Sequence, residues 1–488
     1  MSMSVRKAKG KDVQALCALF ESSIRDMDEK GLDQWRWEVY PNETVLMEDV
    51  EAKTLYVMEE EGQILAAFTI NEEQHPLYAT LYWHFGVNPA VLHRLVVSPG
   101  HQHRGLGREA MAQVIRLAKE MGHDCLRLDT YLKNLRAMAL YEGLGMRKVG
   151  QVQFDERETL FQCYEMPLAE DCPLLPMRMR PYYRCAPELP WGGDKLRRLF
   201  HKDIPSDKTG ESLEISVIPG KESRAESGEG LPELIAAYGK KFVGTAVNGP
   251  FPLLLKLLDA RDILSVQVHP DDAYAAVHEN GKLGKTEAWV ILQADPGAEL
   301  IYGIVPGTTK EELESAALQG AAVEKYLRRV QVAQGDVCEI PAGCVHAIGA
   351  GILLYEIQQS SDVTYRFYDW DRVGPDGKKR PLQIRDAVDA TDLSFHPDLL
   401  HRTPGTGVQP LLKNKIFELC RLNVSGEMPI LPDPRRFAFL TALSSLLLSW
   451  EGDGIELAKG DSVLLPANHP PLNLQGVGEA LYAFPGAC

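Results

Sequence analysis

The spacing of apolar residues predicts helices and strands in mixed order over the first third of the chain. Apolar residues recur at helical spacing in Lys11–Lys30 and again in Glu109–Met121. Two short apolar runs, Thr54–Glu59 and Ile64–Ile70, flank a Glu-Gly turn and are typical of paired strands. We therefore predict a mixed α/β (α+β) domain over residues 1–168.

From about residue 169 the pattern changes to short strands. Prolines crowd the beginning of this part, and we interpret 169–180 as a linker. Apolar runs bounded by Gly, Pro and Asp follow, for example at Val332–Ile340, Ile352–Gln358 and Thr364–Tyr368. A helical pattern over Thr308–Arg329 interrupts them. This rhythm predicts a mainly-β barrel or sandwich with a helical insertion.

A short internal repeat predicts two related barrels. Residues 334–342 (QGDVCEIPA) resemble residues 459–467 (KGDSVLLPA), and each segment is typical of a turn, a strand and a Pro-Ala exit. The same order occurs in the second half of a cupin (jelly-roll) barrel, so we expect cupin-like units at 181–400 and 401–488. The apolar run Phe437–Trp450 is broken by Thr and Ser, and we interpret it as paired strands.

Composition and charge narrow the class of protein. The chain has 488 residues, 45% hydrophobic and 25% charged, which suits a water-soluble protein of several domains. A net charge of -16 argues against general binding to nucleic acid or anionic membranes. The polar amino terminus lacks the apolar core of a signal peptide, and no run is long enough for a membrane helix. Nine cysteines without CxxC spacing suit free thiols, so we expect a cytoplasmic protein.

Four residues of the predicted first barrel could form one metal site. Gln267 and His269 are two positions apart and would face the same side of a strand. Glu287 opens a following strand, and His346 comes just after the first copy of the repeat. Imidazole, carboxylate and amide ligands suit zinc or another divalent ion with a coordination position left open. Spacing alone leaves open the alternative that these histidines are ordinary hydrogen-bonded residues.

Several further segments accompany these residues. They are 190–193 (PWGG), 208–216 (KTGESLEIS), 251–259 (FPLLLKLLD), 266–272 (VQVHPDD), 285–287 (KTE), 341–346 (PAGCVH) and 361–369 (SDVTYRFYD). Together they resemble the type I mannose-6-phosphate isomerases, from about residue 180 to the end of the chain.

The resemblance implies one zinc ion per chain. Its ligands would be Gln267, His269, Glu287 and His346. Lys285 and Arg366 match basic residues that the family places at its substrates, mannose 6-phosphate and fructose 6-phosphate. The second unit keeps His469 without companions, so we expect that barrel to be free of metal.

The implied reaction moves a proton between C1 and C2 of the sugar. A divalent cation can stabilise the negative charge that builds on the sugar oxygens, and a nearby basic side chain adds to this effect. Arg366 offers forked donors to a phosphate. The group that transfers the proton stays open between a zinc-bound water and Lys285.

A glycine motif predicts a cofactor site in the first domain. Gln102-His103-Arg104-Gly105-Leu106-Gly107 fits Q-x-x-G-x-G, between an apolar run and a helix. A strand, a glycine turn and a helix amino terminus form an amide-lined pocket for pyrophosphate. The arrangement resembles the GNAT acetyltransferases over about residues 3–168 and implies acetyl-CoA as cofactor. The residues implied to bind it are Leu95, Val97, Gln102, His103, Arg104, Gly105, Leu106, Gly107, Arg108, Asn134 and Tyr141.

Tyr141 would also protonate the leaving thiolate, according to the same resemblance. The acetyl acceptor cannot be read from these motifs. The leading hypothesis is a bifunctional enzyme with small-molecule substrates, without nucleic-acid or membrane partners. One alternative is a metal-holding cupin that binds a sugar without turnover and carries a regulatory GNAT-like domain. Another is a metal-dependent oxygenase or epimerase, because cupins host many reactions.

Overall fold

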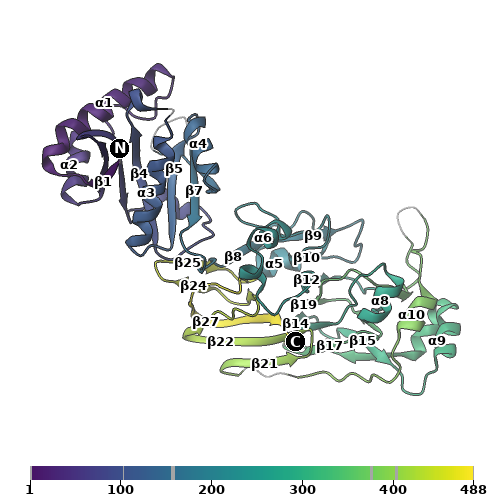
Figure 1. Cartoon of the computed structure of the whole chain (residues 1–488). Coiled ribbons are helices and arrows are strands. Elements are labelled where there is room, and N and C mark those ends of the chain that lie inside the picture. Colours follow the sequence, from purple (N-terminus) through teal and green to yellow (C-terminus); the bar gives the residue numbers. More distant parts are fainter. Residues whose placement is uncertain (1–2, 103, 155–159, 374–376, 402–404, 487–488) are drawn as a thin grey trace. The chain divides into compact units, whose positions relative to one another are not determined.

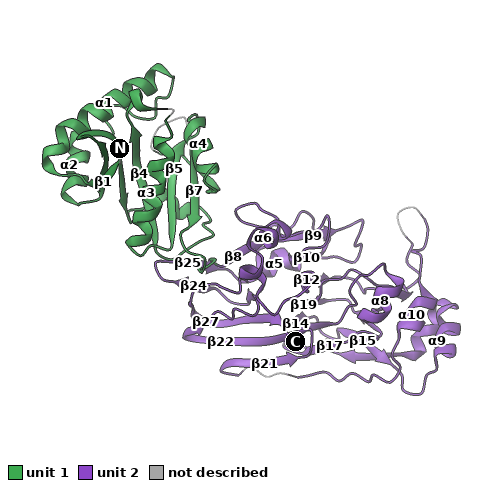
Figure 2. Cartoon of the chain, viewed as in Figure 1, with its two compact units in different colours: residues 1–175 green, residues 176–488 purple. Residues whose placement is uncertain are grey.

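The computed structural model divides the chain into two compact units, residues 1–175 (unit 1) and 176–488 (unit 2) (Figure 2). The structure describes residues 3–102, 104–154, 160–373, 377–401 and 405–486. None of the described helices is both long and apolar enough to cross a membrane.

Unit 1 is a seven-stranded sheet with helices on both faces (Figure 1). The strand order is β1-β2-β3-β4-β5-β7-β6, and β4 and β5 run parallel. The strands are β1 Ser4–Lys7, β2 Leu55–Glu60, β3 Gln63–Asn71, β4 Pro89–Val97, β5 Cys125–Tyr131, β6 Arg147–Val152 and β7 Phe161–Pro167. The helices are η1 Gly10–Asp12, α1 Val13–Glu29, α2 Glu43–Glu51, η2 Pro76–Thr80, η3 Pro99–His101, α3 Leu106–Glu120 and α4 Leu135–Glu142.

Side-chain alternation along β2 explains the two helical layers of unit 1. Tyr56 and Met58 pack on one face with α3 and α4, whereas Leu55 and Val57 pack on the other with α1 and α2. The predicted mixed fold is therefore confirmed, including the amphipathic helices and the β2–β3 hairpin. Helix α3 begins at Leu106, three residues before the predicted start, because the left-handed Gly105 caps it.

The first part of unit 2 contains two sheets that pack face to face. The six-stranded sheet has the order β17-β14-β19-β12-β10-β9, and the five-stranded sheet has the order β16-β15-β18-β13-β20. Their strands are β9 Tyr182–Cys185, β10 Thr209–Ile215, β12 Leu253–Ala260, β13 Val266–Val268, β14 Glu287–Ala294, β15 Glu299–Ile304, β16 Leu327–Gln331, β17 Val337–Ile340, β18 His346–Ile348, β19 Ile352–Gln359 and β20 Tyr365–Tyr368. Trp289, Leu354, Leu300 and Ile348 fill the space between the two sheets.

Helices cover the outer face of the five-stranded sheet, as Figure 1 shows for α9 and α10. Leu313 of α9 and Val388 of α10 pack there against Val268 and Phe367. The helices of unit 2 are α5 Lys195–Phe200, α6 Leu231–Tyr238, α7 Lys240–Val243, α8 Asp272–His278, α9 Lys310–Ala317, η4 Gly320–Tyr326 and α10 Ile384–Ala390. The expected helical insertion corresponds to α9 and η4.

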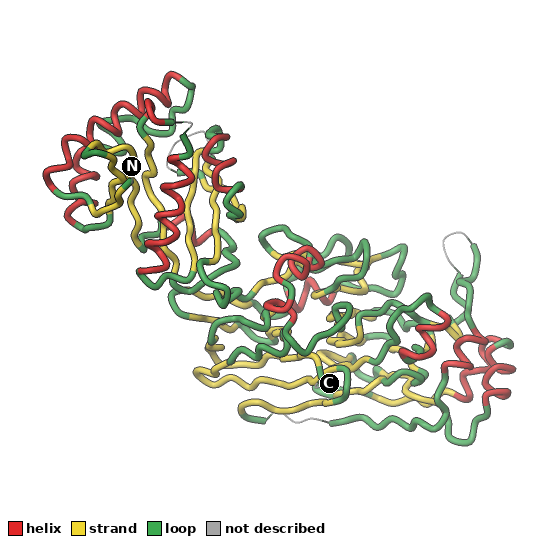
Figure 3. The backbone as a smooth tube through the Cα atoms, in the orientation of Figure 1, coloured by secondary structure: helices red, strands yellow, loops and turns green. Residues whose placement is uncertain are grey.

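The second barrel of unit 2 is built on a nine-stranded sheet, seen as long strands in Figure 3. Its strands are β8 Met177–Arg180, β11 Arg224–Ala225, β21 Gly407–Lys413, β22 Phe417–Ile430, β23 Ala438–Ala442, β24 Leu446–Trp450, β25 Asp453–Leu457, β26 Ser462–Leu465 and β27 Leu472–Pro485. Strand β8 pairs with β26, with Met177 and Met179 buried. The predicted linker is therefore wrong for residues 177–180, and the remaining domain boundaries stay predictions.

The repeated turn has the same hydrogen bonds in both barrels. Gly335 and Gly460 adopt positive φ angles of 93° and 95°. The amide of Gly335 donates to the Ile291 carbonyl (2.8 Å), and the amide of Gly460 donates to the Ala442 carbonyl (2.7 Å). The mainly-β double-cupin fold predicted from this repeat is confirmed. Because of the turn, the strand predicted at Val332–Ile340 begins only at Val337.

The apolar run Phe437–Trp450 forms two strands that do not pair with each other. Strand β23 pairs with the second half of β27 and β24 with the first half, so both lie along the same long neighbour. The prediction of a pair is wrong because β27 is long enough to bind both strands end to end.

Candidate active sites

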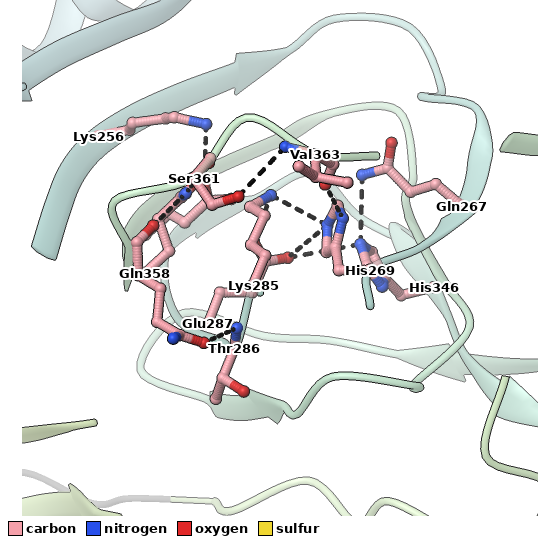
Figure 4. A network of polar contacts seen from close by, with 12 residues as sticks. Lys256, Gln267, His269, Lys285, Thr286, Glu287, His346, Gln358, Ser361 and Val363 are labelled. Atoms are coloured by element: carbon pink, nitrogen blue, oxygen red, sulfur yellow. Dashed lines mark hydrogen bonds and ion pairs between the residues drawn. The ribbon is translucent and has the colours of Figure 1, made fainter. Parts of the chain in front are cut away.

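The residues predicted to hold a metal come together inside the first barrel (Figure 4). Strand pairing places Gln267 of β13 directly opposite His346 of β18, and His269 follows β13. Glu287 is the first residue of β14, in the facing six-stranded sheet. The ligand atoms of His269, Glu287 and His346 lie within 4.8 Å of one another, and all three residues are buried.

Backbone carbonyls fix the orientation of both imidazole rings. His269 Nδ1 donates to the Val363 carbonyl (2.9 Å), and His346 Nδ1 donates to the Cys344 carbonyl (2.9 Å). A carbonyl only accepts hydrogen bonds, so each Nδ1 carries the proton and each Nε2 presents a lone pair. These lone pairs lie near Glu287 Oε1, at 3.7 Å for His269 and 3.4 Å for His346. In metal sites, a hydrogen bond from the other ring nitrogen, such as these Nδ1 contacts with carbonyls, orients a histidine ligand.

The protonation states suit a divalent cation. Burial, together with the Lys285 ammonium, lowers the pKa of His269 to about 3, and burial lowers the pKa of His346. Burial alone would raise the pKa of Glu287, but Lys285 and His269 hold it well below the usual range. At neutral pH the cluster therefore consists of two neutral imidazoles and one carboxylate, the forms that bind metal.

Nitrogen donors meet the lone pairs that a metal would use. The Lys285 ammonium donates to His269 Nε2 (2.9 Å) and pairs with Glu287 Oε2 (2.6 Å). The Gln267 amide nitrogen donates to His346 Nε2 (3.2 Å), and rotation of the amide would turn its oxygen to the cluster. Both oxygens of Glu287 are buried, and the Lys285 ammonium is the cation paired with Oε2. The donor set therefore fits a divalent metal ion.

Arg366 is a second basic residue, and strand pairing places it next to the cluster. It lies on β20, where it pairs opposite Gln267. Its Nε is buried and has no hydrogen-bond partner among the described residues. Burial and the neighbouring Arg380 lower its pKa, because its positive charge is poorly compensated. Such a guanidinium suits an anionic group of a ligand.

A row of buried charges across the six-stranded sheet was missed by the sequence reasoning. The Lys256 ammonium lies 3.1 Å from Glu356 Oε1 and 3.7 Å from Glu211 Oε1. Arg184 pairs with Glu211 at 2.5 Å, and Trp289 Nε1 donates to Glu356 (3.1 Å). Burial and the nearby Glu287 carboxylate raise the pKa of Glu356. The available signal was a charged residue inside an apolar run, such as Lys256 in LLLKLL and Glu356 in LLYEI.

Replacement of Lys256 by methionine is expected to destabilise unit 2. It leaves Glu356 buried without its cation, and such a loss costs about 3–5 kcal/mol of unfolding free energy. Thermal and urea unfolding would measure the change. Lys221→Met removes an ion pair with Glu188 nearer the surface and should cost less than about 1 kcal/mol. Equal stability of the two variants would contradict a stabilising role for the buried row.

The glycine motif of unit 1 lies at the amino terminus of α3. Gly105 has φ 82° and caps the helix, and the first helical hydrogen bond runs from the Glu109 amide to the Gly105 carbonyl (3.1 Å). The amides of Leu106, Gly107 and Arg108 therefore have no partner within the helix. Together with the positive end of the helix dipole they suit a phosphate group.

The other residues predicted to bind the cofactor lie on β4, in the glycine turn itself and on or next to α4. Leu95 and Val97 lie on β4, and the Gln102 side chain accepts from Arg136 (2.7 Å). Arg104 is exposed, whereas His103 lies outside the described residues. Asn134 caps α4 by accepting from the Ala137 amide (3.1 Å).

Tyr141 lies on α4 and is buried, and burial raises the pKa of its hydroxyl above the ordinary value. The hydroxyl therefore stays protonated at neutral pH, as a proton donor requires.

Comparison with known proteins matches both units. Residues 17–146 match the acetyltransferase (GNAT) family, and residues 184–288 match the catalytic domain of the phosphomannose isomerase type I family. The mannose-6-phosphate isomerase of Streptococcus mutans is 38% identical over 309 residues, covering 61% of this chain and 95% of the relative. A 63-residue stretch is 35% identical to human N-acetyltransferase 8, covering 13% of this chain and 28% of that protein.

Solved structures share the fold of unit 2. The mannose 6-phosphate isomerase of Bacillus subtilis has a TM-score of 0.55 at 33% identity, covering 63% of this chain and 99% of that one. A mannose 6-phosphate isomerase crystallised with zinc and yttrium has a TM-score of 0.53 at 16% identity, covering 64% and 100%.

The fold and the two sites define a two-part enzyme, with an acetyltransferase domain followed in sequence by a cupin-type isomerase. The chain belongs to the type I mannose-6-phosphate isomerase family and carries a GNAT-family domain before the isomerase. The predicted fusion is confirmed.

Proposed function

We propose that unit 2 is a zinc-dependent isomerase that interconverts mannose 6-phosphate and fructose 6-phosphate. The observation that carries this proposal is the buried cluster of two neutral histidines and one ionised glutamate beside Lys285. The names of the relatives supply the substrate. Gln267, His269, Glu287 and His346 would hold the ion, since zinc accepts imidazole nitrogen and carboxylate or amide oxygen.

In this proposal, the bound ion acts as a Lewis acid towards the sugar oxygens. The protein side chains bind and orient the sugar phosphate around it. Arg366 offers forked donors to the phosphate, and the buried setting strengthens that contact. Lys285 holds a proton close to His269 and Glu287, where it can counter charge on the enediol oxygens.

A coupled assay of the full-length, zinc-loaded protein tests the proposal. Conversion of mannose 6-phosphate to fructose 6-phosphate is followed with and without a chelator. We expect turnover that the chelator abolishes and that added zinc restores. Among the described residues, Lys285 is the cation in contact with the His269 imidazole and the Glu287 carboxylate, and an ammonium group cannot replace a metal ion as a Lewis acid. Absence of turnover in protein shown to contain zinc would contradict the substrate assignment.

We further propose that unit 1 is an acetyl-CoA-dependent N-acetyltransferase with Tyr141 as the proton donor to the leaving thiolate. The supporting observation is the row of amides at the α3 terminus that have no partner within the helix, together with the protonated Tyr141 on α4. Calorimetric titration with acetyl-CoA tests the cofactor, and absence of binding would contradict it. We also propose a cytoplasmic location, which the eight free cysteines among the described residues support.

A further inference from the structure

A cavity of about 640 Å³ lies in unit 1 and is not explained by the cofactor alone. Leu95, Asn134 and Tyr141 line it, so it reaches the residues assigned to the coenzyme. Trp35, Tyr40 and other residues outside that set line it as well. Small-molecule sites usually occupy roughly 300–1,000 Å³. The volume therefore accommodates the acetyl end of a coenzyme together with one small acceptor.

Aromatic rings form a continuous part of the cavity wall. His75 contacts Phe154 edge-on, with ring centroids 4.7 Å apart, and Phe154 contacts Phe161 at 4.9 Å. Phe161 in turn lies 5.2 Å from Tyr131. Aromatic faces attract cations as well as apolar groups. The wall thus suits an apolar or aromatic body that carries a positive charge.

Among the lining residues that the structure describes, cationic side chains contribute little positive charge to the cavity. Arg94 is the only Arg or Lys among the described lining residues, and both ends of its fork are bound by Asp49, at 2.9 and 2.7 Å. Its remaining amine nitrogen donates to the Tyr40 hydroxyl (2.7 Å). Burial lowers the pKa of the lining His93 to about 4, so that ring is neutral at pH 7. In the described part of the lining, a phosphorylated acceptor would therefore find no uncompensated Arg or Lys.

Carboxyl groups supply the negative charge. Asp129 of β5 lines the cavity and accepts a hydrogen bond from the Tyr78 hydroxyl (2.7 Å). Tyr78 is itself buried, and its ring lies 5.1 Å from Trp83, which holds the hydroxyl in place. Glu73 adds a second carboxylate to the lining. Burial raises the pKa of Asp129 to about 6, within the range of a proton acceptor that works near neutral pH.

We propose that this cavity binds a small, unphosphorylated primary amine with an aromatic or apolar body, whose ammonium group is received by Asp129. The proposal rests on the acetyltransferase function proposed for unit 1. It adds the chemical class of the acceptor and names Asp129 as a catalytic residue. The acceptor of unit 1 would then be unphosphorylated, unlike the sugar phosphates proposed as substrates of unit 2.

The reaction balances with these groups. The ammonium gives one proton to Asp129, and the freed nitrogen lone pair forms a bond to the thioester carbonyl carbon of acetyl-CoA. The tetrahedral adduct then breaks its C–S bond, and the leaving thiolate takes the proton of Tyr141. The nitrogen loses its second proton, which restores Tyr141, and the products are the acetamide, coenzyme A and the proton left on Asp129 for release to water.

Thiol release by the full-length protein tests the proposal. Phenethylamine and tyramine serve as aromatic amines, and glucosamine 6-phosphate serves as the phosphorylated amine. We expect the kcat/KM of the aromatic amines to exceed that of glucosamine 6-phosphate by about 100-fold or more. We expect Asp129→Asn to lower kcat/KM for phenethylamine by about 100-fold or more, the usual contribution of an acid–base group. Acetyl-CoA affinity should stay unchanged in this variant.

Two further variants keep the test decisive. Glu120→Gln removes a carboxylate at the far end of α3, outside the cavity lining, and should leave thiol release unchanged. If Asp129→Asn loses acetyl-CoA affinity through misfolding, Tyr78→Phe keeps the ring and the carboxylate, and should lower kcat/KM about 10-fold. Full activity of Asp129→Asn, or preference for glucosamine 6-phosphate, overturns the proposal. If acetyl-CoA binds but neither aromatic amine is acetylated, the acceptor proposal fails and the acetyltransferase function stands. If acetyl-CoA does not bind, both fail.

Discussion

Replacement of His269 by alanine is expected to remove the metal from unit 2 and to lower isomerase activity by more than about 100-fold, beyond the loss seen when a supporting contact of a metal ligand is removed. The substitution deletes an Nε2 lone pair 3.7 Å from Glu287 Oε1. Lys285 would remain paired with Glu287 at 2.6 Å and would compete with the ion for that carboxylate. Metal content by elemental analysis and the coupled isomerase assay measure the two effects.

A matched histidine serves as the control for this variant. His278 ends α8, is exposed, and stacks on Tyr274 with ring centroids 4.1 Å apart. His278→Ala should keep both metal and activity. A His269→Ala protein with full activity and no bound metal would contradict the metal assignment. Retained metal with lost activity would instead limit His269 to a role in the chemistry.

The sequence could indicate only part of the metal site by spacing. Gln267 and His269 share a side because residues two apart on a strand point the same way. Glu287 and His346 are distant in sequence, and they approach because β13 pairs with β18 while β14 belongs to the facing sheet. Such non-local pairings leave no periodic signal, so the pattern offered these two residues only as candidates, and the family resemblance implied that they are ligands.

The buried charges show a second limit of reasoning from sequence. Lys256 interrupts an apolar strand, but the pattern does not say which residue compensates its charge. Its partners Glu211 and Glu356 lie on the two neighbouring strands, and strand register decides which of them it meets. Register is set by packing and turns over the whole sheet. Similarly, strand β8 was hidden in a proline-rich stretch because its partner β26 lies near the other end of the chain.

The cofactor turn was more predictable because its determinants are local. A glycine with positive φ before a helix is specified within a few residues, and Gly105 adopts φ 82° as its position demands. The proposed acceptor cavity was not predictable, because its lining comes from η2, β4, β5, α4 and β7 as well as loops. No motif around Asp129 marks it as a functional residue, and its partner Tyr78 is distant in sequence, so only the fold brings the two together.

Replacement of Gly105 by glutamate is expected to lower acetyl-CoA affinity about 100-fold, which corresponds to about 2.8 kcal/mol. The left-handed backbone disfavours any side chain at this position by roughly 1–2 kcal/mol, and a carboxylate there would repel the pyrophosphate at the α3 amides. A Cβ at Gly105 would meet no described atom within 4 Å, so the side chain has room to enter the anion site. Calorimetric titration with acetyl-CoA measures the loss.

Gly122 provides a control with the same backbone strain at the opposite end of α3. It has φ 87°, and a Cβ there also meets no described atom within 4 Å. Gly122→Glu should therefore destabilise unit 1 to a similar degree while keeping acetyl-CoA affinity, because the helix carboxy terminus presents carbonyls rather than amides. Isomerase activity should survive in both variants, since its site lies in unit 2. Equal loss of affinity in both variants would mean that folding of unit 1, and not the anion site at Gly105, determines acetyl-CoA binding.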